Sequence, residues 1–150
     1  MLRAKDIMTR DVITVTPATT IEELARLLAE HRISGAPVVN GAGELIGIVT
    51  EHDLVSRDKR LHIPTIIRLF DAYIMLESPG AMEKEIKKMA AVTVEDIYVK
   101  DVITITENNT VEDIATIMTE KKKHLLPVVE GFKVRGIVGR IDLIKGMGRK

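Results

Sequence analysis

Cysteine and tryptophan are both absent from this 150-residue chain, and its aromatic residues are limited to two tyrosines and two phenylalanines. Without cysteine the chain can have no disulfide, no thiolate metal ligand and no cysteine nucleophile. So few aromatic rings leave little surface on which nucleic-acid bases could stack. The 22 basic and 22 acidic residues cancel in charge, which also argues against a strongly basic nucleic-acid-binding protein.

Long apolar runs are lacking as well. No stretch approaches the roughly 20 apolar residues that a membrane-spanning helix needs. The charged residues Arg3, Lys5 and Asp6 come too early for the apolar segment of a secretory signal. With 45% hydrophobic and 29% charged residues, the composition is typical of a folded globular protein. We therefore expect a cytoplasmic domain with no membrane insertion.

Catalytic motifs are not found. The sequence contains no P-loop, no GxSxG and no HExxH pattern. Its four histidines (His31, His52, His62 and His124) are scattered without the spacing of metal ligands. We predict that the chain is not an enzyme, with no catalytic residues, no metal site and no catalytic cofactor.

What the chain does contain is an internal repeat. With a shift of 90 residues Asp-Val-Ile-Thr recurs, as does Pro-Val-Val, and after a one-residue deletion a Gly-Ile-Val-x-x-x-Asp-Leu motif recurs too. The matching segments are 11–14 with 101–104, 37–39 with 127–129, and 47–54 with 136–143. Such self-similarity indicates two copies of one structural unit. We place copy one at residues 1–56 and copy two at 94–150, separated by an insertion at 57–93.

Each copy is expected to follow the order β-α-β-β-α after an opening helical turn. In copy one we predict the helical turn at 4–8, strands at 12–15, 36–39 and 45–49, a helix from residue 21 and a second helix after Thr50. Asn40-Gly41-Ala42-Gly43 predicts a hairpin turn between the last two strands. In copy two we predict the turn at 94–98, strands at 102–105 and 126–129, and a helix from residue 111. Thr19 or Thr20, and Asn109 or Thr110, are candidate helix caps. Ile21, Leu24, Ala25 and Leu28 form one apolar helix face.

Residues 57–93 have a different pattern. Apolar residues at helical spacing predict one helix over 63–76 and a second over 82–90, separated by Ser78-Pro79-Gly80. The favoured interpretation is a helical linker packed on its own core. A partner-binding or dimer-forming hairpin is the alternative, because the first helix is apolar over more than one face. A DNA-binding helix-turn-helix fits less well for the same reason.

The repeated motifs resemble a tandem pair of cystathionine β-synthase (CBS) domains, also called a Bateman module, over residues 4–55 and 94–144. The resemblance implies an α+β fold of the α/β-sandwich type, in which the two repeats pair by pseudo-twofold symmetry. It also implies an adenosine-containing ligand, such as AMP, ADP, ATP or S-adenosylmethionine, in the clefts between the repeats. A homodimer and a regulated enzyme or transporter are the expected partners.

The strand–helix junction at Thr50 and Asp53 is the main candidate site. Unpaired N–H groups where a helix begins suit a phosphate, and a carboxylate suits a ribose diol. The resemblance assigns the phosphate to Thr50 and the ribose to Asp53, whereas ordinary helix capping is the structural alternative. Copy two keeps Asp142 but has Gly139 in place of the hydroxyl residue, so that Arg140 would have to supply a phosphate contact. If a single site is filled, we expect it to be the first.

The resemblance extends both sites to the first strand and to the segment before the second strand, where the base is expected. The full first set is Ile13, Thr14, Val15, Ser34, Gly35, Ala36, Pro37, Thr50, His52 and Asp53. The full second set is Ile103, Thr104, Ile105, Lys123, His124, Leu125, Leu126, Pro127, Gly139, Arg140 and Asp142. The basic run 121–124 either contacts phosphate or complements a helix C-terminus.

The function predicted from these residues is a non-catalytic energy or metabolite sensor that binds an adenosine-containing regulatory ligand. Two alternatives stay open. One is a structural dimerisation or protein-interaction module without ligand. The other is a DNA-associated regulator that uses the helical insertion.

Overall fold

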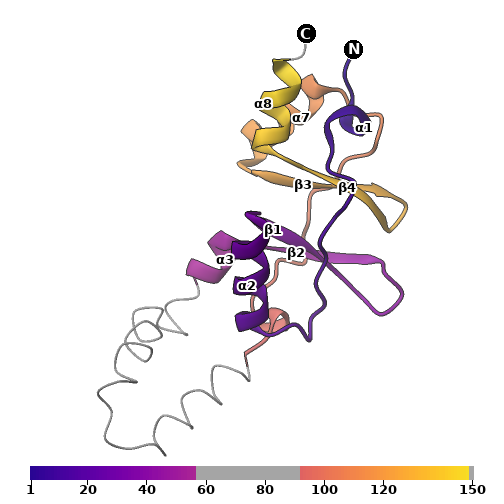
Figure 1. The fold of residues 1–150 in the computed structure, drawn as a ribbon. Coiled ribbons are helices and arrows are strands. Elements are labelled where there is room, and N and C mark those ends of the chain that lie inside the picture. Colours follow the sequence, from indigo (N-terminus) through magenta and orange to yellow (C-terminus); the bar gives the residue numbers. More distant parts are fainter. Residues whose placement is uncertain (57–91, 149–150) are drawn as a thin grey trace, which may run out of the picture. The chain divides into compact units, whose positions relative to one another are not determined.

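The computed structural model describes residues 1–56 and 92–148 (Figure 1). The elements of the first copy are α1 (Ala4–Ile7), α2 (Ile21–His31), β1 (Gly35–Val39), β2 (Leu45–Thr50) and α3 (Glu51–Ser56). Those of the second are the 3₁₀ helix η1 (Val94–Asp96), α7 (Val111–Lys121), β3 (Leu125–Glu130), β4 (Lys133–Gly139) and α8 (Arg140–Met147). The helices predicted at 63–76 and 82–90 lie outside the described residues.

The two long helices begin and end alike in both copies. The side chain of Thr20 accepts a hydrogen bond from the backbone N–H of Glu23, and that of Thr110 accepts one from Asp113, each at 3.1 Å. Of the two candidate caps in each copy, it is therefore the second that caps the helix. Both helices end at a residue in the left-handed conformation, Arg32 with φ 52° and Lys122 with φ 53°.

The strands predicted at 12–15 and 102–105 do not form over their whole predicted length. Only Val15 and Ile105 are bridge residues within them. Ile105 forms a parallel bridge to Val128, with its N–H donating to the carbonyl of Pro127 at 3.0 Å. The chain turns directly afterwards, where Asn109 accepts hydrogen bonds from the backbone and hydroxyl of Thr106. This turn ends the extended run before a longer ladder can form.

In the part of the chain that the structure describes, four strands form two hairpins, each a two-stranded sheet: β1 with β2, and β3 with β4. The second is antiparallel, with Leu125 opposite Gly139 and a bulge between Val128 and Val129. The predicted turn at 40–43 is present. Its Asn40 side chain accepts hydrogen bonds from the backbone of Ala42 and of Glu44, both at 3.0 Å, which fixes the turn.

The described residues group into two compact units, and each draws segments from both copies. Unit 1 comprises Met1–Thr14, Pro37–Gly47 and Lys100–Lys150. Unit 2 comprises Val15–Ala36 and Ile48–Val99. The opening segment of each copy thus groups with the main helix of the other copy, α1 with α7 in unit 1 and η1 with α2 in unit 2.

The core of unit 1 includes α1. Ala4, Ile7 and Met8 are buried in one cluster with side chains from α7, β3, β4 and α8. Thr9 then forms a bridge to Ile137, with N–H to carbonyl distances of 2.9 and 3.0 Å. A Cβ at Gly136 would lie 2.5 Å from the Sδ of Met8, so glycine is what allows the N-terminal segment to approach β4 this closely.

Unit 2 is built around α2. Ile21, Leu24 and Leu28 are buried as predicted. The prediction was wrong at Ala25, which is exposed, while Leu27 on the other flank is half-buried. Burying a leucine removes more apolar area from water than burying an alanine. The buried face of α2 is therefore centred closer to Leu27 than to Ala25. η1 joins this unit through the N–H of Val94, which donates to the carbonyl of Thr19 at 2.8 Å.

Within residues 1–56 and 92–148, no helix combines the length and the apolar composition that crossing a membrane requires.

Candidate functional site

The junction between β2 and α3 is held by two residues. Asp53 Oδ2 accepts hydrogen bonds from the backbone N–H of Thr50 at 2.8 Å and from its hydroxyl at 3.1 Å. The N–H of Asp53 lies 3.4 Å from Thr50 Oγ1. This is a reciprocal cap, so the capping that we gave as the structural alternative is present. Among the described residues nothing bonds Oδ1 of Asp53, and this oxygen is available as an acceptor.

The same capping interaction recurs along the chain. Five aspartates of the described segments accept a hydrogen bond at 2.8–3.1 Å from the backbone N–H three residues earlier: Asp6, Asp53, Asp96, Asp113 and Asp142. A carboxylate at this position is therefore not by itself a sign of a ligand. Asp53 and Asp142 differ from the other three because they are half-buried and because their helices follow directly from a strand.

Unit 2 brings the segment before β1 to the first junction. The N–H of Glu51 donates to the carbonyl of Ser34 at 2.7 Å, which fixes Ser34 beside the start of α3. Val15 is buried in the same unit, and His52 is exposed on α3. Gly35 and Ala36 are buried at the start of β1. The remaining members of the predicted first set, Ile13, Thr14 and Pro37, belong to unit 1.

The second junction lies wholly within unit 1. Asp142 Oδ2 accepts a hydrogen bond from the N–H of Gly139 at 2.8 Å. A Cβ at Gly139 would meet Leu125 at 3.5 Å and the carbonyl of His124 at 3.9 Å, so these residues surround the junction without crowding it. Leu126 and Pro127 are buried in β3 beside Ile105. Ile103 is half-buried against the core and Thr104 is exposed.

Three members of the predicted second set also line a pocket of unit 1, although His124 and Arg140 remain next to the junction in the backbone. Lys123, His124 and Arg140 line a pocket of about 620 Å³ whose wall consists largely of residues from α7 and α8. Asp142 and Gly139 are not part of that lining. The structure thus gathers the carboxylate and glycine at the junction, and the cations in a groove along the two helices.

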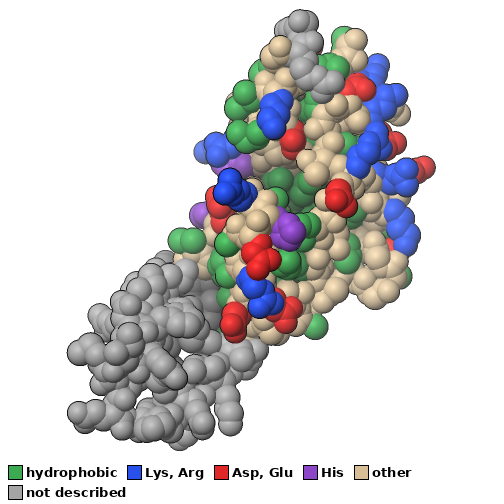
Figure 2. Space-filling view, in the orientation of Figure 1, with side chains coloured by type: hydrophobic (Ala, Val, Ile, Leu, Met, Phe, Trp, Pro, Cys, Tyr) green, Lys and Arg blue, Asp and Glu red, His purple; other side chains and the backbone are tan. Residues whose placement is uncertain are grey.

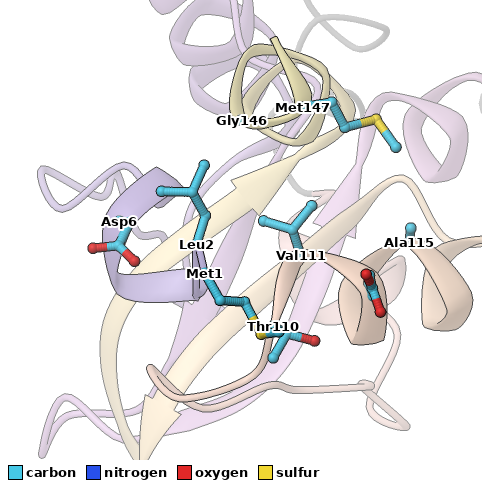
Figure 3. A pocket seen from close by; sticks show the side chains of 9 residues that line it. Met1, Leu2, Asp6, Thr110, Val111, Ala115, Gly146 and Met147 are labelled. Carbon is cyan, nitrogen blue, oxygen red and sulfur yellow. The ribbon is translucent and has the colours of Figure 1, made fainter. Parts of the chain in front are cut away.

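A second pocket, of about 650 Å³, was not foreseen from the sequence (Figure 3). In Figure 3 the side chains of Leu2 and Val111 line it from the N-terminal segment and from α7, and Met147 reaches it from α8. Asp6 and Glu112 add carboxylates to the lining. The apolar spacing of α7 can be recognised in the sequence. No pattern in the sequence predicts that the N-terminal segment packs against this helix.

Asp113, one of the aspartates that cap helices, has a lowered pKa. The hydrogen bond from the backbone N–H of Thr110, followed by that from its hydroxyl, holds the pKa of Asp113 below its ordinary value. A carboxylate that accepts such bonds is stabilised in its charged form. In the described part of the chain no three His, Asp or Glu residues group so that they could hold a metal ion.

Comparison with known proteins gives consistent matches. The family model for the CBS domain matches residues 4–60 and 94–149. An uncharacterized protein of Methanocaldococcus jannaschii is 33% identical over 153 residues, covering 95% of this chain and 89% of that protein. The chloroplastic CBS domain-containing protein CBSX1 of Arabidopsis thaliana is 28% identical over 144 residues, covering 90% of this chain and 58% of that protein.

A further relative is an enzyme of which this chain spans a small part. The inosine-5'-monophosphate dehydrogenase of Korarchaeum cryptofilum is 32% identical over 142 residues, covering 94% of this chain and 23% of the enzyme. The similarity therefore concerns a segment of that enzyme and not its whole length.

Two solved structures have the same fold over nearly their full length. CBSX2 of Arabidopsis thaliana, in complex with AMP, has a TM-score of 0.74 at 24% identity and covers 99% of this chain and 98% of its own. The CBS domain pair of protein MJ0100, in complex with 5'-methylthioadenosine and S-adenosyl-L-methionine, has a TM-score of 0.75 at 25% identity with the same coverage. The predicted α+β fold of paired repeats is confirmed by these matches.

Proposed function

The chain belongs to the CBS domain family, with two copies of the domain in one polypeptide, and from this we propose that it is a non-catalytic regulatory module for an adenosine-containing ligand. The observation that carries the proposal is the repeated strand–helix junction. At each copy a half-buried aspartate follows a strand and orients one carboxylate oxygen toward the backbone. The MJ0100 domain pair, which is similar over nearly its full length, is in complex with two adenosine compounds.

At the first junction each group would have a separate role. Asp53 would keep Oδ2 bonded to the backbone N–H of Thr50, and Oδ1 would accept a hydrogen bond from a ribose hydroxyl. The hydroxyl of Thr50 would exchange its bond to Asp53 for a bond to a phosphate. Val15 and Ser34 to Ala36, which lie in the same unit as this junction, would contact the base through backbone groups and apolar side chains.

At the second junction the phosphate contact would differ. Asp142 keeps the same bond to the backbone, but Gly139 offers no hydroxyl. A charged contact from Arg140, Lys123 or His124 would then be needed, and these side chains lie in the helix groove. A ligand at this junction would bind more weakly unless they turn toward it.

Regulation would arise from differential affinity. A ligand that binds one arrangement of the repeats more tightly than another shifts the equilibrium between them. We propose that the module acts in the cytoplasm as a homodimer, or docked on an enzyme or transporter, and senses adenylate energy charge or S-adenosylmethionine.

The direct test is isothermal titration of the full chain with AMP, ADP, ATP and S-adenosylmethionine. We expect at least one to bind and to raise the melting temperature, since a ligand that binds the native state stabilises it. Asp53→Ala should weaken binding at the first site by roughly 1.5–3 kcal/mol, the range for hydrogen bonds to a charged group. Asp142→Ala should act in the same way at the second site.

The matched control is Asp113→Ala. It removes the same kind of helix cap, from Thr110, but lies outside both predicted sites. Its affinity for the ligand should equal that of the wild type. Equal affinity for Asp53→Ala as well would remove Asp53 from the site, and no binding by any of the four compounds would favour the ligand-free dimerisation module.

A further inference from the structure

The turn between β1 and β2 carries Asn40-Gly41, the one place in the sequence where a glycine follows an asparagine. The backbone nitrogen after an asparagine can attack the carbonyl carbon of its side chain, and glycine hinders this attack least because it has no Cβ. Gly41 is exposed, and a Cβ built on it would have no neighbour within 4 Å. In the described part of the chain no group accepts a hydrogen bond from its N–H. The attacking nitrogen is therefore neither shielded nor bonded.

Three hydrogen bonds hold the side chain of Asn40 in the native turn. Its Oδ1 accepts from the N–H of Ala42 and from that of Glu44, both at 3.0 Å. Its Nδ2 donates to Oε1 of Glu44 at 3.2 Å. The backbone carbonyl of Asn40 also accepts from the N–H of Gly43, at 2.9 Å, which fixes the peptide group that contains the Gly41 nitrogen.

These bonds affect the attack in opposite directions. Donors on Oδ1 draw electrons from the carbonyl carbon and so favour addition to it. The same bonds fix the orientation of the side-chain amide, whereas a nucleophile must approach a carbonyl carbon from above the amide plane. The amide and the peptide group of Gly41 turn toward each other only when the bonds break, and the polarisation is then lost with them. The native turn therefore slows the reaction.

We propose that Asn40 is a site of spontaneous deamidation that the folded turn suppresses and that reacts when the turn opens. The nitrogen of Gly41 forms a bond to Cγ of Asn40, the Cγ–Nδ2 bond breaks, and Nδ2 leaves as ammonia with the proton from Gly41. Water then opens the succinimide ring to aspartate or isoaspartate. An amide and a water molecule thus become a carboxylic acid and ammonia, with no oxidant or reductant. The inference goes beyond the proposed function and does not depend on ligand binding.

The turn of the second copy holds this turn in place. Lys133 Nζ donates to the carbonyl of Ala42 at 2.7 Å, and the N–H of Leu45 donates to the carbonyl of Phe132 at 2.8 Å. All four residues belong to unit 1. The two turns project from the same side of the ribbon (Figure 1), and that edge lies on the open surface in the space-filling view (Figure 2). Water therefore reaches the turn, and opening of the turn requires loss of the contacts with the second copy.

The products of the reaction no longer fit the turn. A carboxylate at position 40 loses the Nδ2 donor and places a negative charge beside Glu44 Oε1, which Nδ2 contacts in the native turn. Like charges at this separation repel each other. Isoaspartate also lengthens the backbone by one methylene, which shifts the register of the turn. Either product should loosen the contact between the turns of the two copies.

The test is peptide mapping by mass spectrometry of the full chain, incubated at mildly alkaline pH with and without a denaturing concentration of urea. Conversion of Asn40 should be at least about tenfold faster in urea, because three hydrogen bonds oppose it in the folded chain. Gly41→Ala should slow conversion in urea by about tenfold, because the added Cβ hinders the attacking nitrogen. An unchanged rate for Gly41→Ala in urea would contradict attack by that nitrogen.

Lys133→Ala separates the effect of the fold from that of local sequence. It removes the bond to Ala42, so the turn should open more often and the native rate should rise several-fold, since the rate follows the population of the open turn. In urea its rate should equal that of the wild type, because residue 133 is distant from Asn40 in the sequence. Lys145→Ala, which is exposed in the same unit, is the control and should leave both rates unchanged.

Asn40→Asp measures the consequence of the modification. Hydrogen exchange at the amide of Leu45, which bonds to Phe132, should be several-fold faster than in the wild type, and Glu44→Gln in the same background should slow it again by removing the repulsion. Three results would overturn the proposal: a native rate equal to or above the rate in urea, no conversion of Asn40 in urea, or a native rate that Lys133→Ala leaves unchanged. Unaltered exchange at Leu45 in Asn40→Asp would overturn the loosening of the turn.

Discussion

Asp113 shows at the scale of a single residue what a carboxylate at a helix start does. The backbone N–H of Thr110 and then its hydroxyl lower the pKa of Asp113. In the unfolded chain, where these bonds are lost, the group binds a proton at a higher pH. Between the two pKa values the unfolded state therefore holds more protons, and the free energy of unfolding rises with pH. This contribution is complete above the ordinary value of about 4 and disappears as the pH falls through the folded-state pKa.

We predict that Asp113→Asn flattens the dependence of stability on pH in the acidic range. The amide oxygen can still accept the cap bond but cannot titrate. Urea unfolding between about pH 3 and pH 6 measures the slope. Glu112→Gln is the control, because the Glu112 side chain accepts no cap bond, and its slope should stay closer to the wild type. Equal slopes for wild type and Asp113→Asn would show that the cap bond does not carry the effect.

At the scale of single elements, the packing of β4 depends on Gly136, which lies against the buried side chain of Met8. A Cβ on Gly136 would lie 2.5 Å from Met8 Sδ and 3.1 Å from the carbonyl of Thr9. We predict that Gly136→Ala destabilises the protein by about 1–3 kcal/mol, the cost of overpacking a core. Gly41→Ala, in a turn with nothing within 4 Å, should be close to neutral in the same denaturant titration. A neutral Gly136→Ala would mean that Met8 moves aside freely.

How much of this could be read from the sequence differs between elements. The order of helices and strands, the caps and the hairpin at Asn40 depend on neighbours within a few residues, and the repeat presents each signal twice. The strands at 12–15 and 102–105 were overestimated because β-branched composition reports strand preference but not the presence of a partner. Ala25 was misplaced because helical spacing does not fix which flank of the stripe is buried.

In the candidate site too, features that depend on local sequence could be predicted, and features that depend on tertiary packing could not. The Thr50–Asp53 junction is local, so the sequence could offer capping there as an alternative to ligand binding. The bond from the N–H of Gly139 to Asp142 was not predicted. Arg140 was assigned to the ligand because it follows Gly139 in the chain. Lys123 and His124 were assigned to it because the resemblance places the segment before the second strand at the site. Their place in the helix groove depends on how α7 packs against α8, and no short-range pattern encodes that packing.

In the whole molecule, the chain opens with a segment that completes the core of the second copy. Ile7 of α1 is buried in unit 1, and its Cγ2 lies 2.8 Å from the position of a Cβ on Gly146 of α8. We predict that Ile7→Ala lowers the free energy of unfolding by about 2–5 kcal/mol. Hydrogen exchange should then speed up in β4 and α8, more than 120 residues away in sequence, before it does in α2. Lys5→Ala, exposed on the same helix, should leave both regions protected. Faster exchange confined to the N-terminal residues would show that the second copy holds its core without α1.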